Sequence, residues 1–150
     1  FQDRNKVIIS KISKSMNHID NGDVVVFHED SKRDFIKRVI GTPGDTVEYK
    51  GDQLYVNNKK VSEPYLDYNK KHKQGQYLTG SFKSSQIKGS NGEMKLPKDK
   101  YLVLGDNRQN SIDSRFDVVG LVDKKQLVGK VVWRYWPFNE WKTNFNPGTF

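Results

Sequence analysis

Short apolar runs rich in β-branched residues recur along the chain, and turn residues separate them. Two of these turns, Asn21-Gly22-Asp23 and Lys50-Gly51-Asp52, carry the residues that tight turns prefer. Almost no stretch shows the 3.6-residue spacing of an amphipathic helix. The pattern therefore predicts an all-β, mainly antiparallel fold, arranged as a barrel or a sandwich. The expected strands are 7–9, 24–27, 35–40, 46–49, 53–56, 101–104, 120–122 and 128–135.

The apolar runs weaken between residues 58 and 98, where lysine and glycine are frequent. Residues 58–100 contain ten lysines and no arginine against four acidic residues, so most of the +8 net charge lies there. We expect 58–98 to be a lysine-rich, non-catalytic subdomain inserted into a catalytic β core made of 1–57 and 99–150. Its lysines are expected to form a solvated face, with attraction to anionic lipid as the alternative.

Composition excludes several kinds of chemistry. The 150 residues include no cysteine, which rules out disulfides and thiolate catalysis. His18, His28 and His72 lie in polar stretches, without partners at the spacing of a metal site or a catalytic triad. The glycines of 41–45 are not followed by the Lys-Ser/Thr ending of a phosphate-binding loop. We therefore expect neither a metal nor a cofactor.

Lys37 lies in the middle of the apolar run 35–40. Under strict strand alternation, its neighbour Arg38 faces the opposite side of the sheet. If Lys37 enters a cleft, desolvation lowers the pKa of its amine and allows it to act as a general base. The alternative is a solvated lysine on an edge strand, and this segment taken alone favours that alternative.

Residues 105–115 follow the expected strand 101–104 and are dense in functional groups, including two potential Asp/Arg pairs. An ordinary turn needs only one or two such residues. Taken alone, the segment would be explained as an elaborate turn held by side-chain hydrogen bonds. Its candidate site residues are Gly105, Asp106, Asn107, Arg108, Ser111, Asp113, Ser114 and Arg115.

Together, 37–45 and 105–115 resemble the two most diagnostic sequence boxes of the type I signal peptidases. Residues 22–27 resemble the strand box that precedes them in that family, and Trp136-Pro137-Phe138 is similar to its Gram-positive branch. The resemblance implies a signal-peptidase/LexA-like β-barrel core and a serine endopeptidase that uses a Ser/Lys dyad. A self-cleaving LexA-like protein shares the dyad but fits these boxes less well.

The resemblance also implies roles for individual residues. Lys37 corresponds to the general base, and Ser111 corresponds to the hydroxyl that orients it. Asp113 and Arg115 correspond to a buried ion pair beside the site, and Gly105 to the small residue that lets the backbone approach the lysine. The residues expected to support the site as further members of these boxes are Arg38, Asp106, Asn107, Arg108 and Ser114.

The family's nucleophile lies in a Ser-Met-x-Pro-Thr segment, and these residues contain no such segment. Ser15-Met16 imitates its first two positions but lacks the Pro-Thr and lies too close to 22–27, so we reject Ser15. Residues 1–4 are similar to the residues directly after the Pro-Thr in the family. We therefore expect the nucleophile shortly before Phe1, and we expect residues 1–150 alone not to cleave a substrate.

The partners implied are preprotein signal peptides with small residues before the cleavage site. The resemblance further implies a single-pass anchor before Phe1 in the cytoplasmic membrane, with the catalytic domain on the extracytoplasmic face. The C-terminal aromatic residues are expected to pack in the core, with lipid contact as the alternative. These residues are Trp133, Tyr135, Trp136, Phe138 and Trp141.

Two other functions remain open. The first is a catalytically silent relative that binds preproteins or assists assembly; the presence of Lys37 argues against it, because binding needs no base. The second is a basic β-barrel that binds nucleic acid. Such a protein would require aromatic and basic residues interleaved on one strand face. Here the charge gathers in 58–100 instead. We therefore expect no nucleic-acid partner.

Overall fold

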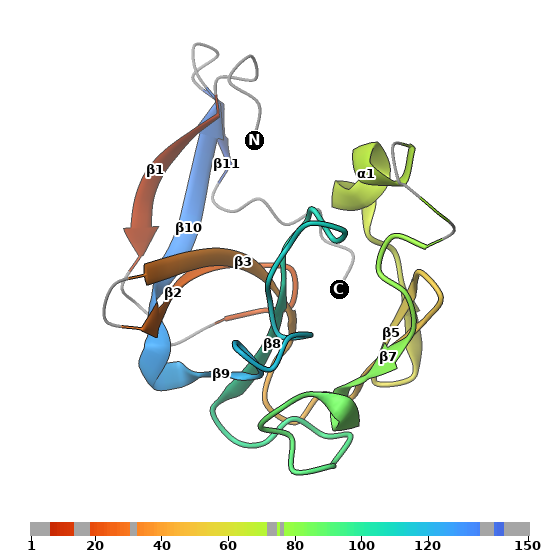
Figure 1. Cartoon of the computed structure of the whole chain (residues 1–150). Helices are drawn as coiled ribbons and strands as arrows, with labels where there is room; N and C mark the ends of the chain where they lie inside the picture. Colours follow the sequence, from red (N-terminus) through yellow and green to blue (C-terminus); the bar gives the residue numbers. More distant parts are fainter. Residues whose placement is uncertain are drawn as a thin grey trace.

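Two β-sheets form most of the computed structural model, which describes residues 7–13, 19–30, 33–71, 75, 77–135 and 140–142 (Figure 1). The larger sheet runs in the order β1 (Val7–Ser13), β10 (Leu127–Tyr135), β2 (Val24–Asp30), β3 (Arg33–Gly41), β8 (Lys100–Leu104) and β9 (Val122–Asp123), with β11 (Glu140–Lys142) paired to β10. The smaller sheet runs in the order β6 (Lys59–Val61), β5 (Gln53–Val56), β4 (Val47–Lys50) and β7 (Phe82–Lys83). The short helical segments are η2 (Pro64–Leu66), α1 (Asp67–Lys71), η3 (Ser84–Gln86) and η4 (Lys124–Gln126).

The predicted all-β, mainly antiparallel class is confirmed. All strand pairs in the described residues are antiparallel, and the helical segments are short. The larger sheet is an open path from β1 to β9, so the described strands do not close into the barrel that the resemblance implied.

Strand β8 has apolar core on both of its faces. Leu102 and Leu104 pack with residues of the smaller sheet such as Val47. Tyr101 and Val103 pack on the opposite face with residues of β2 and β9. A strand covered on both faces reads as a continuous apolar run, as 101–104 does. The loop that follows β8 therefore starts from a strand packed on both faces, and Figure 1 shows β8 on the side of the larger sheet that is nearer the smaller sheet.

Strand β3 lies between β2 and β8 and is therefore an internal strand. Lys37 pairs with Val25 of β2, and Arg38 pairs with Leu104 of β8. Lys37 is half-buried, whereas Arg38 is buried. Taken alone, this segment favoured a solvated lysine on an edge strand, and that interpretation is wrong. The order of strands in a sheet depends on pairings with distant parts of the chain, which the local sequence does not reveal.

The smaller sheet contains strands from both sides of the expected boundary at residue 57. The β4–β5 hairpin precedes that boundary, whereas β6 and β7 come from the lysine-rich stretch and pair with β5 and β4. Tyr49, Leu54 and Val61 share one core across it. The described lysines between 59 and 98 are all exposed, as expected of a solvated face. The division into a catalytic core and an insertion stays a prediction.

No helix in the described part of the chain is long and apolar enough to cross a membrane.

Some residues singled out in the sequence lie outside the described residues or have side chains that are not described. The side chains of Trp133, Tyr135 and Trp141 are not described, and Ser15, His18, His72, Trp136 and Phe138 lie outside the described residues altogether.

Candidate active site

Lys37 and Ser111 meet in space although 74 positions separate them in the chain. The Nζ of Lys37 donates a hydrogen bond of 2.8 Å to the Oγ of Ser111. Strand β3 carries the lysine, and the loop after β8 carries the serine. Because β3 and β8 are paired, the expected base and the hydroxyl expected to orient it lie side by side.

The surroundings of Lys37 favour the neutral amine. Burial lowers the pKa of Lys37 below its ordinary value and is the largest influence on it. Asp113 raises this pKa, Arg115 lowers it and Asp106 raises it, and all three lie on the loop after β8. The Phe35 ring, two residues earlier on β3, has its centroid 5.6 Å from Nζ. A lowered pKa makes the amine more readily available in its neutral form, which is the form that accepts a proton.

Gly105 leaves the space in which Lys37 and Ser111 meet. A Cβ atom at position 105 would overlap the Oγ of Ser111, and it would lie 2.6 Å from the Ser111 Cβ and 3.2 Å from the Lys37 Nζ. Any side chain at this position would therefore push the serine away from the lysine. This geometry supports the role that the resemblance implies for Gly105.

Asp113 and Arg115 form a bidentate ion pair beside the site. Arg115 donates from Nε to Asp113 Oδ1 at 2.8 Å and from Nη2 to Asp113 Oδ2 at 2.9 Å. The fully buried Asp113 also accepts a hydrogen bond of 2.9 Å from the Gly105 N–H. Arg115 Nη2 donates to the Arg108 carbonyl at 2.8 Å. Bidentate pairs have a defined geometry, so these bonds fix the loop on both sides of Ser111.

Arg38 holds the start of the loop from the opposite face of β3. Its Nε and Nη2 donate to the two carboxylate oxygens of Asp106 at 3.0 and 2.9 Å. Its Nη1 donates to the Gly22 carbonyl at 2.8 Å. The guanidinium carbon lies 4.1 Å from the centroid of the Tyr65 ring. Arg38 thus connects the loop, the turn before β2 and the segment after β6.

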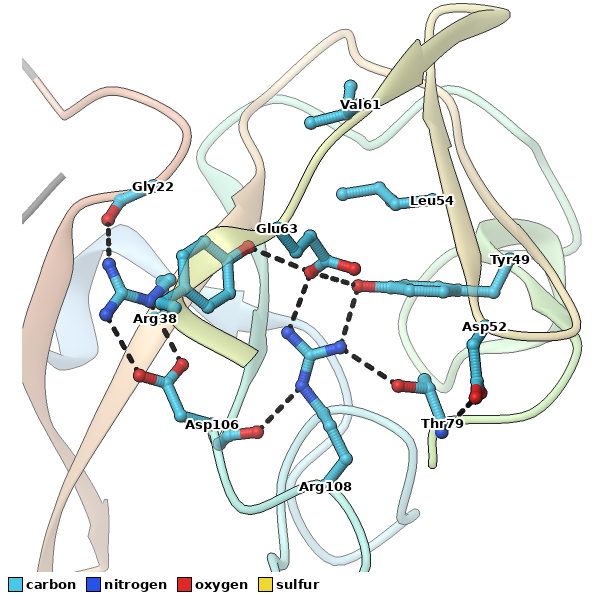
Figure 2. A network of polar contacts seen from close by, with 12 residues as sticks. Gly22, Arg38, Tyr49, Asp52, Leu54, Val61, Glu63, Thr79, Asp106 and Arg108 are labelled. Atoms are coloured by element: carbon cyan, nitrogen blue, oxygen red, sulfur yellow. Dashed lines mark hydrogen bonds and ion pairs between the residues drawn. The ribbon is translucent and has the colours of Figure 1, made fainter. Parts of the chain in front are cut away.

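Arg108 lies at the centre of a buried polar cluster (Figure 2). Its Nη2 donates to Glu63 Oε2 at 2.9 Å, and its Nη1 donates to the Tyr49 hydroxyl at 2.8 Å and to Thr79 Oγ1 at 3.1 Å. Its Nε donates to the Gly105 carbonyl at 2.8 Å. The side chains of Arg108 and Glu63 are 0% and 2% exposed. A charge so deeply buried needs this many partners.

Glu63 receives two further hydrogen bonds in this cluster. The hydroxyls of Tyr49 and Tyr65 each donate to its Oε2 at 2.8 Å. Burial raises the pKa of Tyr49 well above its ordinary value, so the phenol stays protonated and able to donate. We refer to Arg108, Glu63, Tyr49, Tyr65 and Thr79 as the Arg108 cluster.

The other predicted site residues play smaller parts. Ser114 is buried, and its Oγ accepts a hydrogen bond of 2.9 Å from the Val103 N–H, which attaches the loop to β8. Asn107 is exposed. Asp113 pairs with Arg115 within 105–115, whereas Asp106 pairs with Arg38 and Arg108 pairs with Glu63. The described residues contain no group of three or more His, Cys, Asp or Glu side chains that could hold a metal.

Four members of the Arg108 cluster were not predicted from the sequence, namely Glu63, Tyr49, Tyr65 and Thr79. A weak signal for Glu63 was present, because it lies two residues after the buried Val61 and extended chains place such residues on the same side. Its pairing with Arg108, 45 positions away, left no signal in the sequence.

Comparisons with known proteins identify the family of this chain. The family model described as "Signal peptidase, peptidase S26" matches residues 1–136. The chain belongs to this family. Signal peptidase IB of Staphylococcus aureus (strain Mu50 / ATCC 700699) is 53% identical over 148 residues, which cover 98% of this chain and 76% of that protein. Signal peptidase I of Bacillus caldolyticus is 46% identical over 142 residues, covering 94% and 75%.

The fold comparison gives the same family. A crystal structure of a signal peptidase I from Enterococcus faecalis V583 has a TM-score of 0.68 and 33% sequence identity to this chain. The match covers 77% of this chain and 98% of that one. The overall fold of the chain is therefore similar to that of a signal peptidase I.

Proposed function

We propose that this chain is the catalytic domain of a type I signal peptidase, a serine endopeptidase that removes signal peptides from exported preproteins. The observation that carries the proposal is the 2.8 Å hydrogen bond from Lys37 Nζ to Ser111 Oγ, formed in a half-buried site. The family match and the 53% identity to a signal peptidase IB support it.

In the proposed mechanism, the neutral amine of Lys37 acts as the general base. It takes the proton of a serine hydroxyl while the oxygen attacks the scissile carbonyl, and it then gives that proton to the leaving amine. The acyl-enzyme that results is hydrolysed by water, which Lys37 activates in the same way. Ser111 keeps the amine aimed at its target. The attacking serine is the one that the resemblance places in a Ser-Met-x-Pro-Thr segment before Phe1.

The proposed substrate is an extended peptide with small residues before the cleavage site. Three exposed apolar side chains lie on the catalytic loop or just after it, namely Ile112, Phe116 and Val118, with exposed fractions of 52%, 48% and 59%. Such a surface suits contact with an apolar peptide or with lipid. The resemblance to signal peptidases supports the further proposal that the protein is anchored in the cytoplasmic membrane with its site at the outer face.

The proposal is tested by Lys37→Ala in the protein that carries the serine segment. Processing of a preprotein is expected to fall by about 100-fold or more, since a general base contributes that much. Circular dichroism should show an intact fold. Lys50→Ala is the matched control, because Lys50 is an exposed lysine on another strand.

Two results would contradict the proposal in different ways. Processing by Lys37→Ala at the original rate would show that Lys37 is not the base. An unmodified protein that binds preproteins but never cleaves them would favour the catalytically silent relative instead.

A further inference from the structure

The loop of residues 105–115 is held from both faces of β3. Lys37 and Arg38 are neighbours on this strand and face opposite sides. Ser111 meets Lys37 on one side. On the other side, Tyr65 has its ring beside Arg38 and donates its hydroxyl to Glu63, which pairs with Arg108. The loop is therefore attached to the smaller sheet as well as to the strand that carries the expected base.

A short path leads from the Arg108 cluster to the Lys37–Ser111 contact. Arg108 Nε binds the Gly105 carbonyl at 2.8 Å, and Gly105 is the residue that leaves room for Ser111 beside Lys37. The space at Gly105 is so tight that a small movement of this residue would change the distance between Lys37 Nζ and Ser111 Oγ. Figure 2 shows Arg108 between Glu63 and the start of the loop.

The stability of the fold does not by itself explain why the Arg108 cluster is made of buried charged and polar groups. A buried ion pair can often be replaced by apolar groups of the same size without a loss of stability. Here a buried carboxylate is instead surrounded by two tyrosine hydroxyls and a guanidinium, all directed at one oxygen, Glu63 Oε2. Directional bonds of this sort define position more narrowly than apolar packing does.

We infer that Glu63 is a positioning residue for catalysis: by holding Arg108 it fixes Gly105, and so keeps Ser111 within hydrogen-bond distance of Lys37. This inference rests on the function proposed above and deepens it. Glu63 is attached to the smaller sheet through β6. The smaller sheet would therefore contribute to the reaction although it supplies no reacting group.

The test is Glu63→Gln, which keeps the shape of the side chain and removes its charge. In the protein that carries the serine segment, kcat is expected to fall roughly 10-fold or more, because small misplacements of reacting groups are costly. KM should change little, since Glu63 is buried. Glu63→Asp retains the carboxylate and should recover part of the lost kcat.

The matched control is Glu48→Gln. Glu48 lies on β4 of the same sheet, but its carboxylate does not belong to the Arg108 cluster. This variant should keep both kcat and KM. Each variant is assayed well below its own Tm, so that lost activity cannot come from unfolding. If Glu63→Gln does not fold, Tyr65→Phe takes its place, because it removes one hydroxyl from Glu63 and leaves the charges in position.

An unchanged kcat in the folded variant would overturn the inference, as would a rise in KM that accounts for the whole loss of kcat/KM. Lys37→Ala, assayed in parallel, separates this inference from the proposed function. If Lys37→Ala is as active as the unmodified protein, the proposed function fails. If Lys37→Ala is inactive while Glu63→Gln has full kcat, the inference about Glu63 alone is wrong.

Discussion

The cationic side chains on the two faces of β3 have different hydrogen-bond partners. On one face, Lys37 is half-buried and its amine is bonded to a hydroxyl, that of Ser111. On the other face, Arg38 and Arg108 are buried and each is bonded to a carboxylate. A carboxylate partner would hold the lysine in its charged form, whereas a hydroxyl does not.

This difference separates two tasks. Arginine cannot lose its proton in a protein, so its bonds to carboxylates serve only to hold parts of the structure in place. A lysine can become neutral when it is desolvated. Lys37 is half-buried, and this burial lowers its pKa. The positively charged residues that fix the loop are thus distinct from the one expected to exchange a proton.

The largest expected effect comes from replacing one cation on each face with methionine. Arg108→Met leaves Glu63 buried without its counter-charge, so the free energy of unfolding should fall by about 3–5 kcal/mol. Lys37→Met removes a charge from a place where burial disfavours it, so stability near neutral pH should stay the same or rise. Urea denaturation of both variants measures the contrast, and equal losses of stability would contradict it.

The pH dependence of stability sharpens the same contrast. Because the pKa of Lys37 is lowered in the folded protein, the unfolded chain binds this proton more tightly. The resulting cost to stability is fully present below the folded pKa and disappears as the pH rises from the folded pKa to the unfolded pKa. The difference in unfolding free energy between Lys37→Met and the unmodified chain should shrink over that range.

A smaller effect on stability, with a large effect on activity, is expected from Gly105→Ala. The added Cβ would collide with Ser111 and Lys37, and overpacking of this kind costs about 1–3 kcal/mol. Processing by the protein that carries the serine segment should fall on the order of 100-fold, because Ser111 is displaced from the base. Gly44→Ala is the control for activity, since a Cβ there would meet no atom within 4 Å, although its φ of +89° makes the substitution strained. Full activity of Gly105→Ala would show that the Lys37–Ser111 contact is not needed.

The smallest expected effect is a shift in the pH profile of kcat/KM, which reports the pKa values of the free enzyme. Asp113 raises the pKa of Lys37 and Arg115 lowers it. Asp113→Asn should therefore move the acid limb to lower pH, and Arg115→Gln should move it to higher pH. Shifts of the same sign in both variants would exclude Lys37 as the group that titrates.

The sequence was sufficient for most of the strands and for the principal pair of the site, but it did not predict β6, β7 or β11. The β-branched runs predict the strands because their chemistry is local, and β8 is recognisable because both of its faces are apolar. Lys37 and Ser111 were found through the two sequence boxes in which they lie. Sequence alone could not show that β3 is internal, because the strands beside it are determined by contacts between residues that are far apart in the chain.

The Arg108 cluster shows most clearly what the sequence does not reveal. Arg108 was singled out as a member of its box, but its partners come from strands and turns that carry no functional pattern. Tyr49 reads as a core residue and Glu63 as one of four acids in a basic stretch. Only the pairing of β4, β5 and β6 brings them together beside the loop.

The most direct test of the account is the pKa of Lys37 itself. An NMR titration of the lysine side-chain signals in residues 1–150 gives this value, with Lys37→Met used to assign the signal. We predict that Lys37 titrates clearly below the ordinary range of a lysine and that its signal responds to Ser111→Ala. Titration at or above the ordinary lysine value would contradict the claim that this site holds a general base.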